Sequence, residues 1–394
     1  MGKNKISLLL GGLILYVAST GISLKAFSAS GTSSNSGNTN ITSPLAKTSG
    51  SPKRQFRIDP AIPRDQVCPL NGQMFTKQEK DVWDKRRPLT VMIENHEEAR
   101  PQSGLSYADI VYEALAEGWI TRFMGVYYCD TAAGNVAFAP VRSARTYFVD
   151  WVSEYDALYN HVGGAGRCED TTVDVRAKAL CQIDRFGIKD LDQFGIGFPD
   201  CYRNPDRLDH PVATEHQMVC FSDNLYKIGA KRGWTNVDED DVSWDKNFTE
   251  WKFKDDAKEA QRGTPKPLKI VFAEGYDKFD VKWDYDKASN MYKRSNGEVP
   301  HLDKETGEQL AVKNVVVQIS KLTGPVDEHA HILYQTIGNG KAIIFQDGKV
   351  MEGLWRKSSR TARTMFYDAD GNPVEFSRGK IWIEIVPSIK DVSY

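Results

Sequence analysis

The chain has 394 residues, of which 40% are hydrophobic and 26% are charged, and its formal net charge is −2 at pH 7. This length is enough for two domains with hydrophobic cores, and the composition is that of an ordinary folded protein. The small net charge excludes a general attraction to nucleic acid or to an anionic membrane, so any charged partner has to be recognised by a local cluster.

Residues 1–28 have the pattern of an export segment. Lys3 and Lys5 precede an apolar run from Ile6 to Leu24, which is the order found in secretory signals and in N-terminal membrane anchors. The run is just long enough to span a bilayer, and Ala26-Phe27-Ser28 offers the small residues that a signal peptidase reads. A cleaved signal peptide and an uncleaved anchor are both open, and both place the rest of the chain outside the cytoplasm.

Residues 29–86 are predicted to be a disordered tether followed by a transition to the folded part. The segment 29–56 is rich in Ser, Thr, Gly and Asn and has almost no large apolar residue, so it cannot bury enough surface to offset the entropy lost on ordering. Further on, Cys68-Pro69-Leu70-Asn71-Gly72 indicates a turn that is held by a disulfide.

The six cysteines fit an exported protein, because all of them lie between residues 68 and 220 and their number is even. An oxidising compartment allows up to three disulfides, whose pairing the sequence alone does not fix. Buried free thiols are the alternative. The chain has no C-x-x-C pair, which argues against a zinc knuckle. The disulfide candidates are Cys68, Cys129, Cys168, Cys181, Cys201 and Cys220.

Residues 87–235 are predicted to form an α/β domain, with a mixed sheet and flanking helices. Short apolar runs bounded by polar residues are typical of buried strands, and these runs are 89–93, 110–115, 123–128 and 136–138. Apolar residues at helical spacing predict helices over 146–158, 171–183 and 218–231. Strands that alternate with helices favour a layered α/β structure.

A charged linker is predicted over residues 236–266, and a β-rich domain over residues 267–394. The second domain consists of short β-type runs that are separated by turn residues, with Asp347-Gly348 and Asp370-Gly371 as hairpin signals. The tryptophans of the latter half of the chain are expected to be core residues more than an exposed sugar-stacking surface. They are Trp234, Trp244, Trp251, Trp283, Trp355 and Trp382.

Polar side chains follow the predicted strands of the first domain at the points where the strands end, and open α/β sheets usually place ligands there. Several of these residues are arginines, whose guanidinium groups bind phosphate through two-point contacts. The rival interpretation is a buried network of arginines and carboxylates that only specifies the fold. The candidate ligand-binding residues are Glu94, Asn95, Arg100, Asp109, Arg122, Arg142, Arg145 and His161, the last beside a glycine-rich turn.

No metal site or cofactor is predicted from sequence spacing. His96, His210 and His216 lack a close ligand pattern, and His329-x-His331 shows one only weakly. The chain also has no G-x-S-x-G, Walker or dinucleotide-binding fingerprint, so the usual hydrolase and nucleotide-binding interpretations lose their support.

Four motifs carry a family resemblance: ENHEEARPQSGLSYADIVYEALAEGWITRF, APVRSAR, YRNPDR and IIFQDGKVMEGLWRK. With these motifs in this order, residues 87 to 388 resemble the YerB-type lipoprotein family of the bacterial cell envelope. The resemblance implies an exported, membrane-tethered protein with N- and C-terminal domains of unknown function. No cysteine precedes Cys68, so the cysteine that would carry a lipid is missing.

The first domain also resembles the LytR-CpsA-Psr type transferases, through Glu94-Asn95, Arg100, Asp109, Pro140-Val141-Arg142 and Asn160-His161-Val162-Gly163-Gly164. That resemblance implies arginines that hold a pyrophosphate and carboxylates that hold its Mg²⁺. The chain has Ser143 after the arginine where that family has Asp, and it lacks an Asp near Glu94. Both departures favour binding over catalysis.

We therefore predict an extracytoplasmic protein, membrane-tethered or secreted, that is a non-catalytic binding module for an anionic envelope polymer or for another envelope protein. Nucleic acid is not an expected partner, and the membrane is contacted through the N-terminal segment. The alternative is a phosphotransferase that acts on a polyprenyl-pyrophosphate-linked glycopolymer, and Mg²⁺ is an expected cofactor only in that case.

Overall fold

The computed structural model describes residue 59 and residues 61–394. The predictions of an export segment over 1–28 and of a tether that starts at residue 29 lie outside the described residues. Among the residues that are described, no helix is both long enough and apolar enough to cross a membrane.

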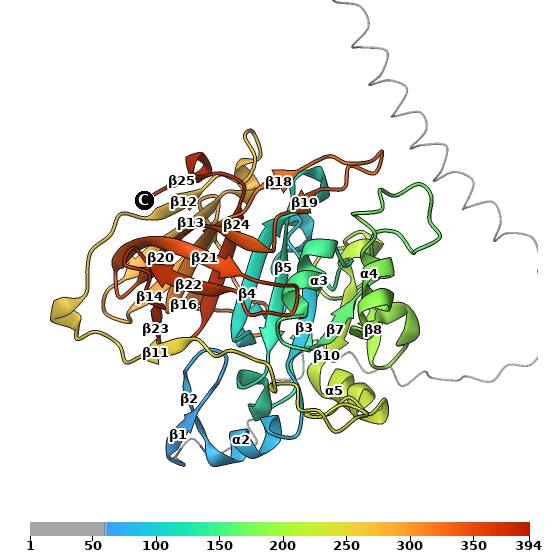
Figure 1. The fold of residues 1–394 in the computed structure, drawn as a ribbon, viewed down its shortest axis with the longest axis horizontal. Helices are drawn as coiled ribbons and strands as arrows, with labels where there is room; N and C mark the ends of the chain where they lie inside the picture. Colours follow the sequence, from blue (N-terminus) through green and yellow to red (C-terminus); the bar gives the residue numbers. More distant parts are fainter. Residues whose placement is uncertain (1–58, 60) are drawn as a thin grey trace, which may run out of the picture. The chain divides into compact units, whose positions relative to one another are not determined.

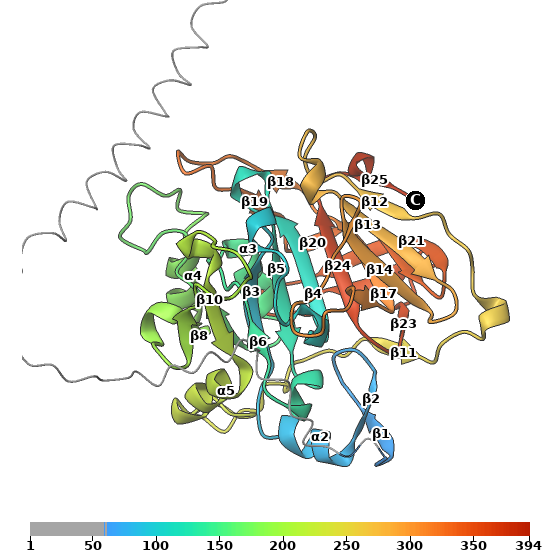
Figure 2. The ribbon, with the colours of Figure 1, turned by 180° about the vertical axis from the view of Figure 1, so that it is seen from behind.

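A ten-stranded mixed sheet runs through both predicted domains (Figure 1). Five strands come from each segment, and the two sets meet where β24 pairs in parallel with β4, from Ile381 opposite Ile110 to Ile385 opposite Ala114. Figure 2 shows the same two strands side by side from behind. In spatial order the strands are β22 (Met365–Asp368), β21 (Lys349–Lys357), β20 (Gly338–Gln346), β17 (Asn314–Ile319), β24 (Ile381–Val386), β4 (Ile110–Leu115), β5 (Thr121–Tyr127), β3 (Leu89–Glu94), β7 (Leu158–His161) and β8 (Lys189–Asp192).

The central strands are covered on both faces, which explains their near-continuous apolar sequences. Every residue of β3, β4, β5 and β24 is buried. The four apolar runs that predict strands in the first segment correspond to β3, β4, β5 and β6 (Ala137–Phe138). The predicted fold class, an α/β segment followed by a β-rich segment, is confirmed.

An antiparallel sheet from the C-terminal segment covers one face of the main sheet. The indole rings of Trp283 in β13 and Trp382 in β24 meet edge to face at 5.4 Å, so these two of the predicted core tryptophans lie between the sheets. The strands of this second sheet are β15 (Val299–Pro300), β14 (Met291–Asn296), β13 (Val281–Asp286), β12 (Leu268–Ile270) and β25 (Val392–Ser393), with β16 (Ala311–Val312) paired to β14.

Helices α3 (Thr146–Val152) and α4 (Ala179–Phe186) are shorter than their predicted ranges. Helix α3 ends early because Asp156 has a positive φ of 42° and β7 starts at Leu158. A third predicted helix splits into strand β10 (Met218–Phe221) and helix α5 (Ser222–Lys231). The four apolar residues of β10 form a strand because β6 and β9 (Cys201–Arg203) pair with it on both sides, a long-range contact that local periodicity does not reveal.

The ordered structure begins before residue 87, with the hairpin β1 (Arg64–Val67) and β2 (Met74–Thr76) and then helix α2 (Lys77–Trp83). The side chains of Thr76 and Glu79 form a capping box that fixes the start of α2. The charged segment 236–266 also contains a short strand, β11 (Lys252–Lys254), which pairs with β23 (Glu375–Ser377). The last small sheet pairs β18 (Leu322–Thr323) with β19 (Leu333–Tyr334).

Candidate functional site

Strand direction places most of the predicted site residues at one edge of the main sheet. Strands β3 and β4 are both antiparallel to β5, so they run the same way, and β7 and β8 run parallel to β3. The carboxyl ends of these strands therefore lie at a common edge, where β5 begins. We call this edge, with Glu94, Leu115, Thr121 and His161 at its strand termini, the strand-end edge.

An open cleft of about 440 Å³ lies at this edge, and we call it the strand-end cleft. Its volume is within the range of small-ligand pockets. One wall is the loop that carries His329 and His331 between β18 and β19, and His329 Nε2 lies 3.2 Å from Thr172 Oγ1 on the opposite side. The lining residues are Glu117, Ser143, Arg145, Gly164, Ala165, Gly166, Asp170, Thr172, Val173, His329 and His331.

Arg145 and Glu117 form a two-point ion pair in the wall of the strand-end cleft. Arg145 Nε and Nη2 donate to the two carboxylate oxygens of Glu117, both at 2.6 Å. Burial by itself opposes the charge on Glu117, but the Arg145 guanidinium outweighs it and holds the pKa of Glu117 at about 2. The pair is charged across the physiological range, and it uses the face of Arg145 that a phosphate would need.

Arg122 is buried behind the cleft wall and does not face an open anion site. Its Nη1 donates to the carbonyl of Ser143 at 2.9 Å. Burial, together with the neighbouring positive charge of Arg145, lowers the pKa of Arg122 to about 10. The guanidinium therefore holds the Ser143 backbone in place.

Glu94 is shared between two partners at the end of β3. Arg142 Nε lies 3.1 Å from Glu94 Oε1, and His216 Nδ1 lies 2.7 Å from Glu94 Oε2. The pKa of His216 is raised, mainly by its hydrogen bond to Glu94. Glu94 itself is only 5% exposed, so its charge is used within the protein.

Asn95 and Arg100 form a hydrogen-bonded unit in the loop after β3. Arg100 Nε and Nη2 donate to the side-chain and backbone oxygens of Asn95 at 3.1 and 3.0 Å. Arg100 also donates to the carbonyl of Lys278 at 2.8 Å, which ties the loop to the second sheet. Burial lowers the pKa of Arg100 to about 10, and the charge of Arg294 adds to the effect.

His161 is a buried structural residue at the end of β7. One ring nitrogen lies 2.8 Å from Asp190 Oδ1 and the other lies 2.8 Å from the carbonyl of Gly163. Both nitrogens are therefore engaged, and the ring fixes the start of the glycine-rich turn that lines the cleft.

Asp109 lies at the opposite edge of the sheet, directly before the first residue of β4. Its Oδ2 accepts the backbone N–H groups of Tyr128 and Cys129 at 2.7 and 3.0 Å, and its Oδ1 accepts Asn71 Nδ2 at 2.9 Å. Burial, with a smaller contribution from the charge of Asp130, raises the pKa of Asp109 to about 7. The two backbone N–H groups stabilise the charged carboxylate and so act in the opposite direction. The fold therefore separates Asp109 from the strand-end cleft and from the other predicted site residues.

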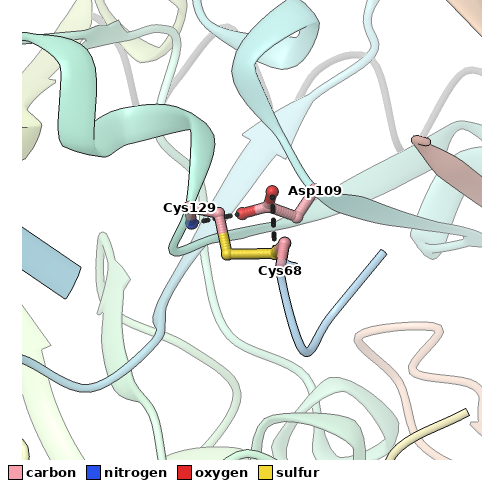
Figure 3. Close-up of side chains that lie close together, drawn as sticks. All are labelled: Cys68, Asp109 and Cys129. Carbon is pink, nitrogen blue, oxygen red and sulfur yellow. Dashed lines mark hydrogen bonds between the residues drawn. A yellow bond between two sulfur atoms is a disulfide. The ribbon is translucent and has the colours of Figure 1, made fainter. Parts of the chain in front are cut away.

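Asp109 instead lies against the disulfide between Cys68 and Cys129 (Figure 3). Cys68 Sγ is 3.9 Å from Asp109 Oδ1; this is a contact between atoms, because a disulfide sulfur carries no proton. The two sulfurs are bonded to each other, so they offer no thiolate to a metal ion alongside the Asp109 carboxylate.

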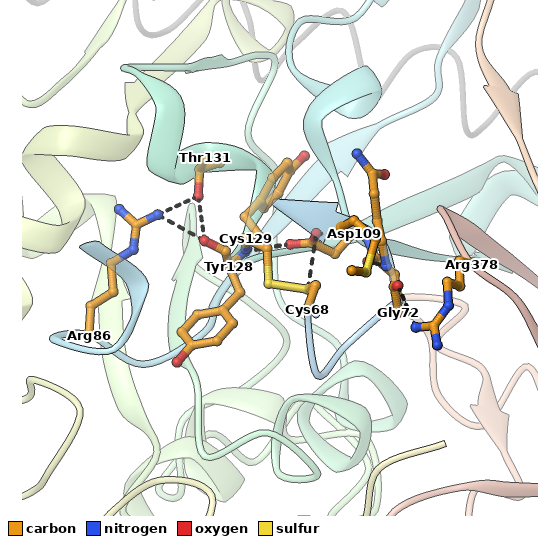
Figure 4. Close-up of a disulfide and its surroundings, with 12 residues drawn as sticks. Cys68, Gly72, Arg86, Asp109, Tyr128, Cys129, Thr131 and Arg378 are labelled. Carbon is orange, nitrogen blue, oxygen red and sulfur yellow. Dashed lines mark hydrogen bonds between the residues drawn. A yellow bond between two sulfur atoms is a disulfide. The ribbon is translucent and has the colours of Figure 1, made fainter. Parts of the chain in front are cut away.

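Arginines hold the backbone on both sides of this disulfide (Figure 4). Arg86 Nη2 donates to the carbonyl of Tyr128 at 2.9 Å and to Thr131 Oγ1 at 3.0 Å. Arg378 Nη1 donates to the carbonyl of Gly72 at 3.0 Å. These contacts connect the N-terminal hairpin to the C-terminal segment and give the Asp109 environment a structural role.

All six cysteines are oxidised, as predicted. The pairs are Cys68 with Cys129, Cys168 with Cys181 and Cys201 with Cys220. The second pair closes the loop that carries Asp170 and Thr172 into the strand-end cleft.

A buried charged network lies between the two sheets, and its residues are not among those predicted from the sequence. Arg294 Nη2 donates to both carboxylate oxygens of Glu113 at 2.9 and 2.7 Å, and both side chains are fully buried. His301 Nδ1 is 2.6 Å from Arg294 Nη1, and burial holds the pKa of His301 well below its usual range. The available signal was a glutamate inside an otherwise apolar strand, because Glu113 interrupts β4 as Glu384 interrupts β24.

Two family models match the chain. The N-terminal domain of "Protein of unknown function (DUF3048)" matches residues 74–233, and its C-terminal domain matches residues 268–383. Together these matches cover more than half of the sequence. The chain belongs to this family.

Members of the family are similar to this chain over most of its length. The "Putative lipoprotein YerB" of Bacillus subtilis (strain 168) is 29% identical over 326 residues, which cover 83% of this chain and 88% of that relative. The crystal structure of the YerB protein from Bacillus subtilis matches with a TM-score of 0.66 and 26% identity, over 83% of this chain and 99% of that chain. The resemblance to the YerB-type family is confirmed.

Proposed function

We propose that this protein is an extracytoplasmic envelope protein that acts as a non-catalytic binding module, and that the strand-end cleft receives a strand of an envelope polymer. Placement outside the cytoplasm is supported by the export pattern of the N-terminal sequence, by the three disulfides and by the lipoprotein name of the relative. The cleft carries the functional part of the proposal.

The observation that carries the binding role is a polar cleft with two exposed aromatic residues close to its lining residues, Trp119 along the chain and Phe194 over the neighbouring Gly163. Trp119 is 47% exposed and follows two residues after Glu117, and Phe194 is 75% exposed. The Phe194 ring lies over Gly163: a Cβ atom placed on Gly163 would be 3.1 Å from Phe194 Cε2. A single exposed apolar side chain is ordinary on a protein surface, so these two rings support the proposal only through their positions beside a polar cleft. Flat rings beside hydrogen-bonding groups suit the apolar face and the hydroxyl edge of a sugar.

The charges at the cleft favour binding over phosphoryl transfer. The Arg145 guanidinium is already occupied by Glu117, and Arg122 is occupied by the Ser143 carbonyl. Asp109, which the transferase alternative would use near Mg²⁺, lies at the opposite edge of the sheet. A paired guanidinium still offers its remaining N–H groups to neutral oxygens, so hydroxyl and amide groups of a polymer are the expected contacts. No specific observation favours the transferase alternative.

The test is co-sedimentation of the full-length chain, in detergent, with purified cell-wall polymer. Trp119→Ala combined with Phe194→Ala should weaken retention by about tenfold or more, since buried aromatic contacts dominate binding energy. Tyr276→Ala is the matched control, because Tyr276 is similarly exposed at 44% but is neither near Glu117 in the chain nor in contact with Gly163. Equal retention of the double variant and the control would reject the cleft as the binding site. Retention by envelope proteins alone would indicate a protein partner.

A further inference from the structure

His96, Glu98 and His216 lie together although 120 residues of sequence separate the two histidines. His96 and Glu98 come from the loop after β3, and His216 ends the short 3₁₀ turn Thr214–His216. One ligand atom from each residue lies within 4.8 Å of the other two. The two imidazole rings stack with centroids 4.9 Å apart, and His216 Nε2 is 3.6 Å from Glu98 Oε2.

We propose that His96, Glu98 and His216 form a binding site for a divalent transition-metal ion of the zinc type. Two imidazoles and one carboxylate are a ligand set that zinc takes in sites with an open fourth position. The same set also suits other first-row ions, such as Co²⁺ and Mn²⁺. The proposal is independent of the polymer-binding cleft, since none of these three side chains lines it.

The hydrogen bonds around His216 leave the correct nitrogen available to an ion. Glu94 Oε2 accepts from His216 Nδ1 at 2.7 Å, so the proton of the neutral ring stays on Nδ1 and the Nε2 lone pair faces Glu98. A carboxylate on the far nitrogen of a histidine is the usual support for a metal ligand, because it fixes both the tautomer and the ring orientation. Glu94 is therefore a positioning residue.

The two segments that supply the ligands are fixed to each other by Arg207. Its guanidinium donates to the carbonyl of His216 at 3.0 Å, to the carbonyl of Pro101 at 2.9 Å and to the carbonyl of Ala99. Arg207 is only 4% exposed. One buried side chain thus sets the separation of the His96–Glu98 loop and His216. The two imidazole planes are 15° from parallel, so ion binding requires the His96 ring to rotate until both lone pairs meet the ion.

Access and charge are both compatible with an ion. His216 is buried, but the Glu98 side chain is 61% exposed, so an ion with bound water can enter from solvent. Arg142 offsets the charge of Glu94, not that of Glu98. His96 Nδ1 accepts the backbone N–H of Glu98 at 3.3 Å, and ligation by His96 replaces this long hydrogen bond.

The test uses the full-length chain in detergent, purified with a tag free of histidine and stripped with a chelator. Zn²⁺ titrated alone should bind at one ion per chain and raise the melting temperature, because a ligand of the folded state stabilises it. Co²⁺ should give the visible absorption of a tetrahedral complex. Glu98→Gln should weaken Zn²⁺ binding by about tenfold or more. Loss of a residue that only supports a metal ligand already has an effect of about this size, and Glu98 is proposed as a ligand itself.

Glu98→Gln is the decisive variant, because an exposed side chain can change without unfolding the protein. His96→Ala is a second variant with the same expectation. His210→Ala is the matched control: His210 pairs with Asp209 on the surface and lies outside the cluster. Absence of stoichiometric binding by a folded wild-type chain would overturn the proposal. So would binding that Glu98→Gln and His96→Ala leave unchanged.

Discussion

Glu113 and Glu384 occupy directly opposed positions on the neighbouring parallel strands β4 and β24, and both are fully buried. Arg294 pairs with Glu113 through two hydrogen bonds, whereas Trp283 Nε1 donates to Glu384 at 2.8 Å. One guanidinium cannot neutralise two carboxylates. Burial, followed by the charge of Glu113, raises the pKa of Glu384 well above its usual range. Burial and the neighbouring carboxylate therefore both favour the neutral form of Glu384.

Arg294→Met should destabilise the protein by about 3–5 kcal/mol, because it leaves the Glu113 carboxylate buried without a counter-charge. Chemical denaturation followed by tryptophan fluorescence would measure the loss. Arg176→Met is the control, since Arg176 pairs with Asp174 on the surface and should leave the unfolding midpoint unchanged. Equal midpoints for the two variants would contradict a dominant role for the Glu113–Arg294 pair.

Glu384→Gln should unfold at the same denaturant concentration as the wild type, or at a higher one. The amide has the shape of the protonated carboxyl group, and its oxygen can accept the Trp283 N–H as Glu384 Oε1 does. If Glu384 were instead charged and stabilised by neighbouring groups, Glu384→Gln would remove that stabilisation. The unfolding midpoint at pH 7 would then fall clearly below that of the wild type.

Asp109 should make stability depend on pH. Its pKa of about 7 in the folded protein lies above the value of about 3.9 in an unfolded chain. The folded state therefore binds the proton more tightly, and the free energy of unfolding should fall as the pH rises from about 4 to about 7 and then level off. The slope, measured by denaturation at several pH values, should be smaller in Asp109→Asn than in the wild type. Asp206→Asn, an exposed control, should keep the wild-type slope, and an unchanged slope in Asp109→Asn would refute the shift.

The Arg145–Glu117 pair should make stability depend on pH in the opposite direction, so that its contribution is lost at low pH. The pKa of Glu117 is depressed to about 2, so this stability is complete above about pH 4.5 and is lost as the pH falls toward 2. Arg145→Ala should lower the melting temperature at pH 7 by more than it does at pH 3. A melting temperature that Arg145→Ala leaves unchanged at pH 7 would show that the guanidinium is free to bind a ligand.

Two of the disulfides should differ in how much they stabilise the folded protein. Cys68–Cys129 closes a separation of 61 residues and Cys168–Cys181 one of 13. Loop-closure entropy then predicts a loss of about 4 kcal/mol when the first pair is replaced by serines, and about 3 kcal/mol for the second. The first replacement also disturbs the packing around Asp109, which increases the difference. Thermal melts of the two double variants would test the order, and a larger loss for the shorter loop would contradict it.

The sequence by itself determined the central strands and the oxidised state of the cysteines. The run Ile110–Leu115 is buried on both faces of the sheet, and its short length, apolar character and polar flanks together predict a strand. Arg122, Arg145 and His161 could be assigned to one sheet edge because they begin, follow or end predicted strands. Disulfide formation could be predicted because the even number of cysteines and the N-terminal export pattern are both visible in the sequence.

Tertiary structure alone decided which of these residues work together. Asp109 directly precedes β4, so the direction of β4 places it at the far edge. Strand direction has no local signature. Met218–Phe221 became a strand because two distant strands pair with it. Glu113 meets Arg294 across 181 residues, and His96 meets His216 across 120. Local periodicity records whether a residue is buried, but the partner of a buried charge is chosen by long-range strand pairing, which no short stretch of the sequence encodes.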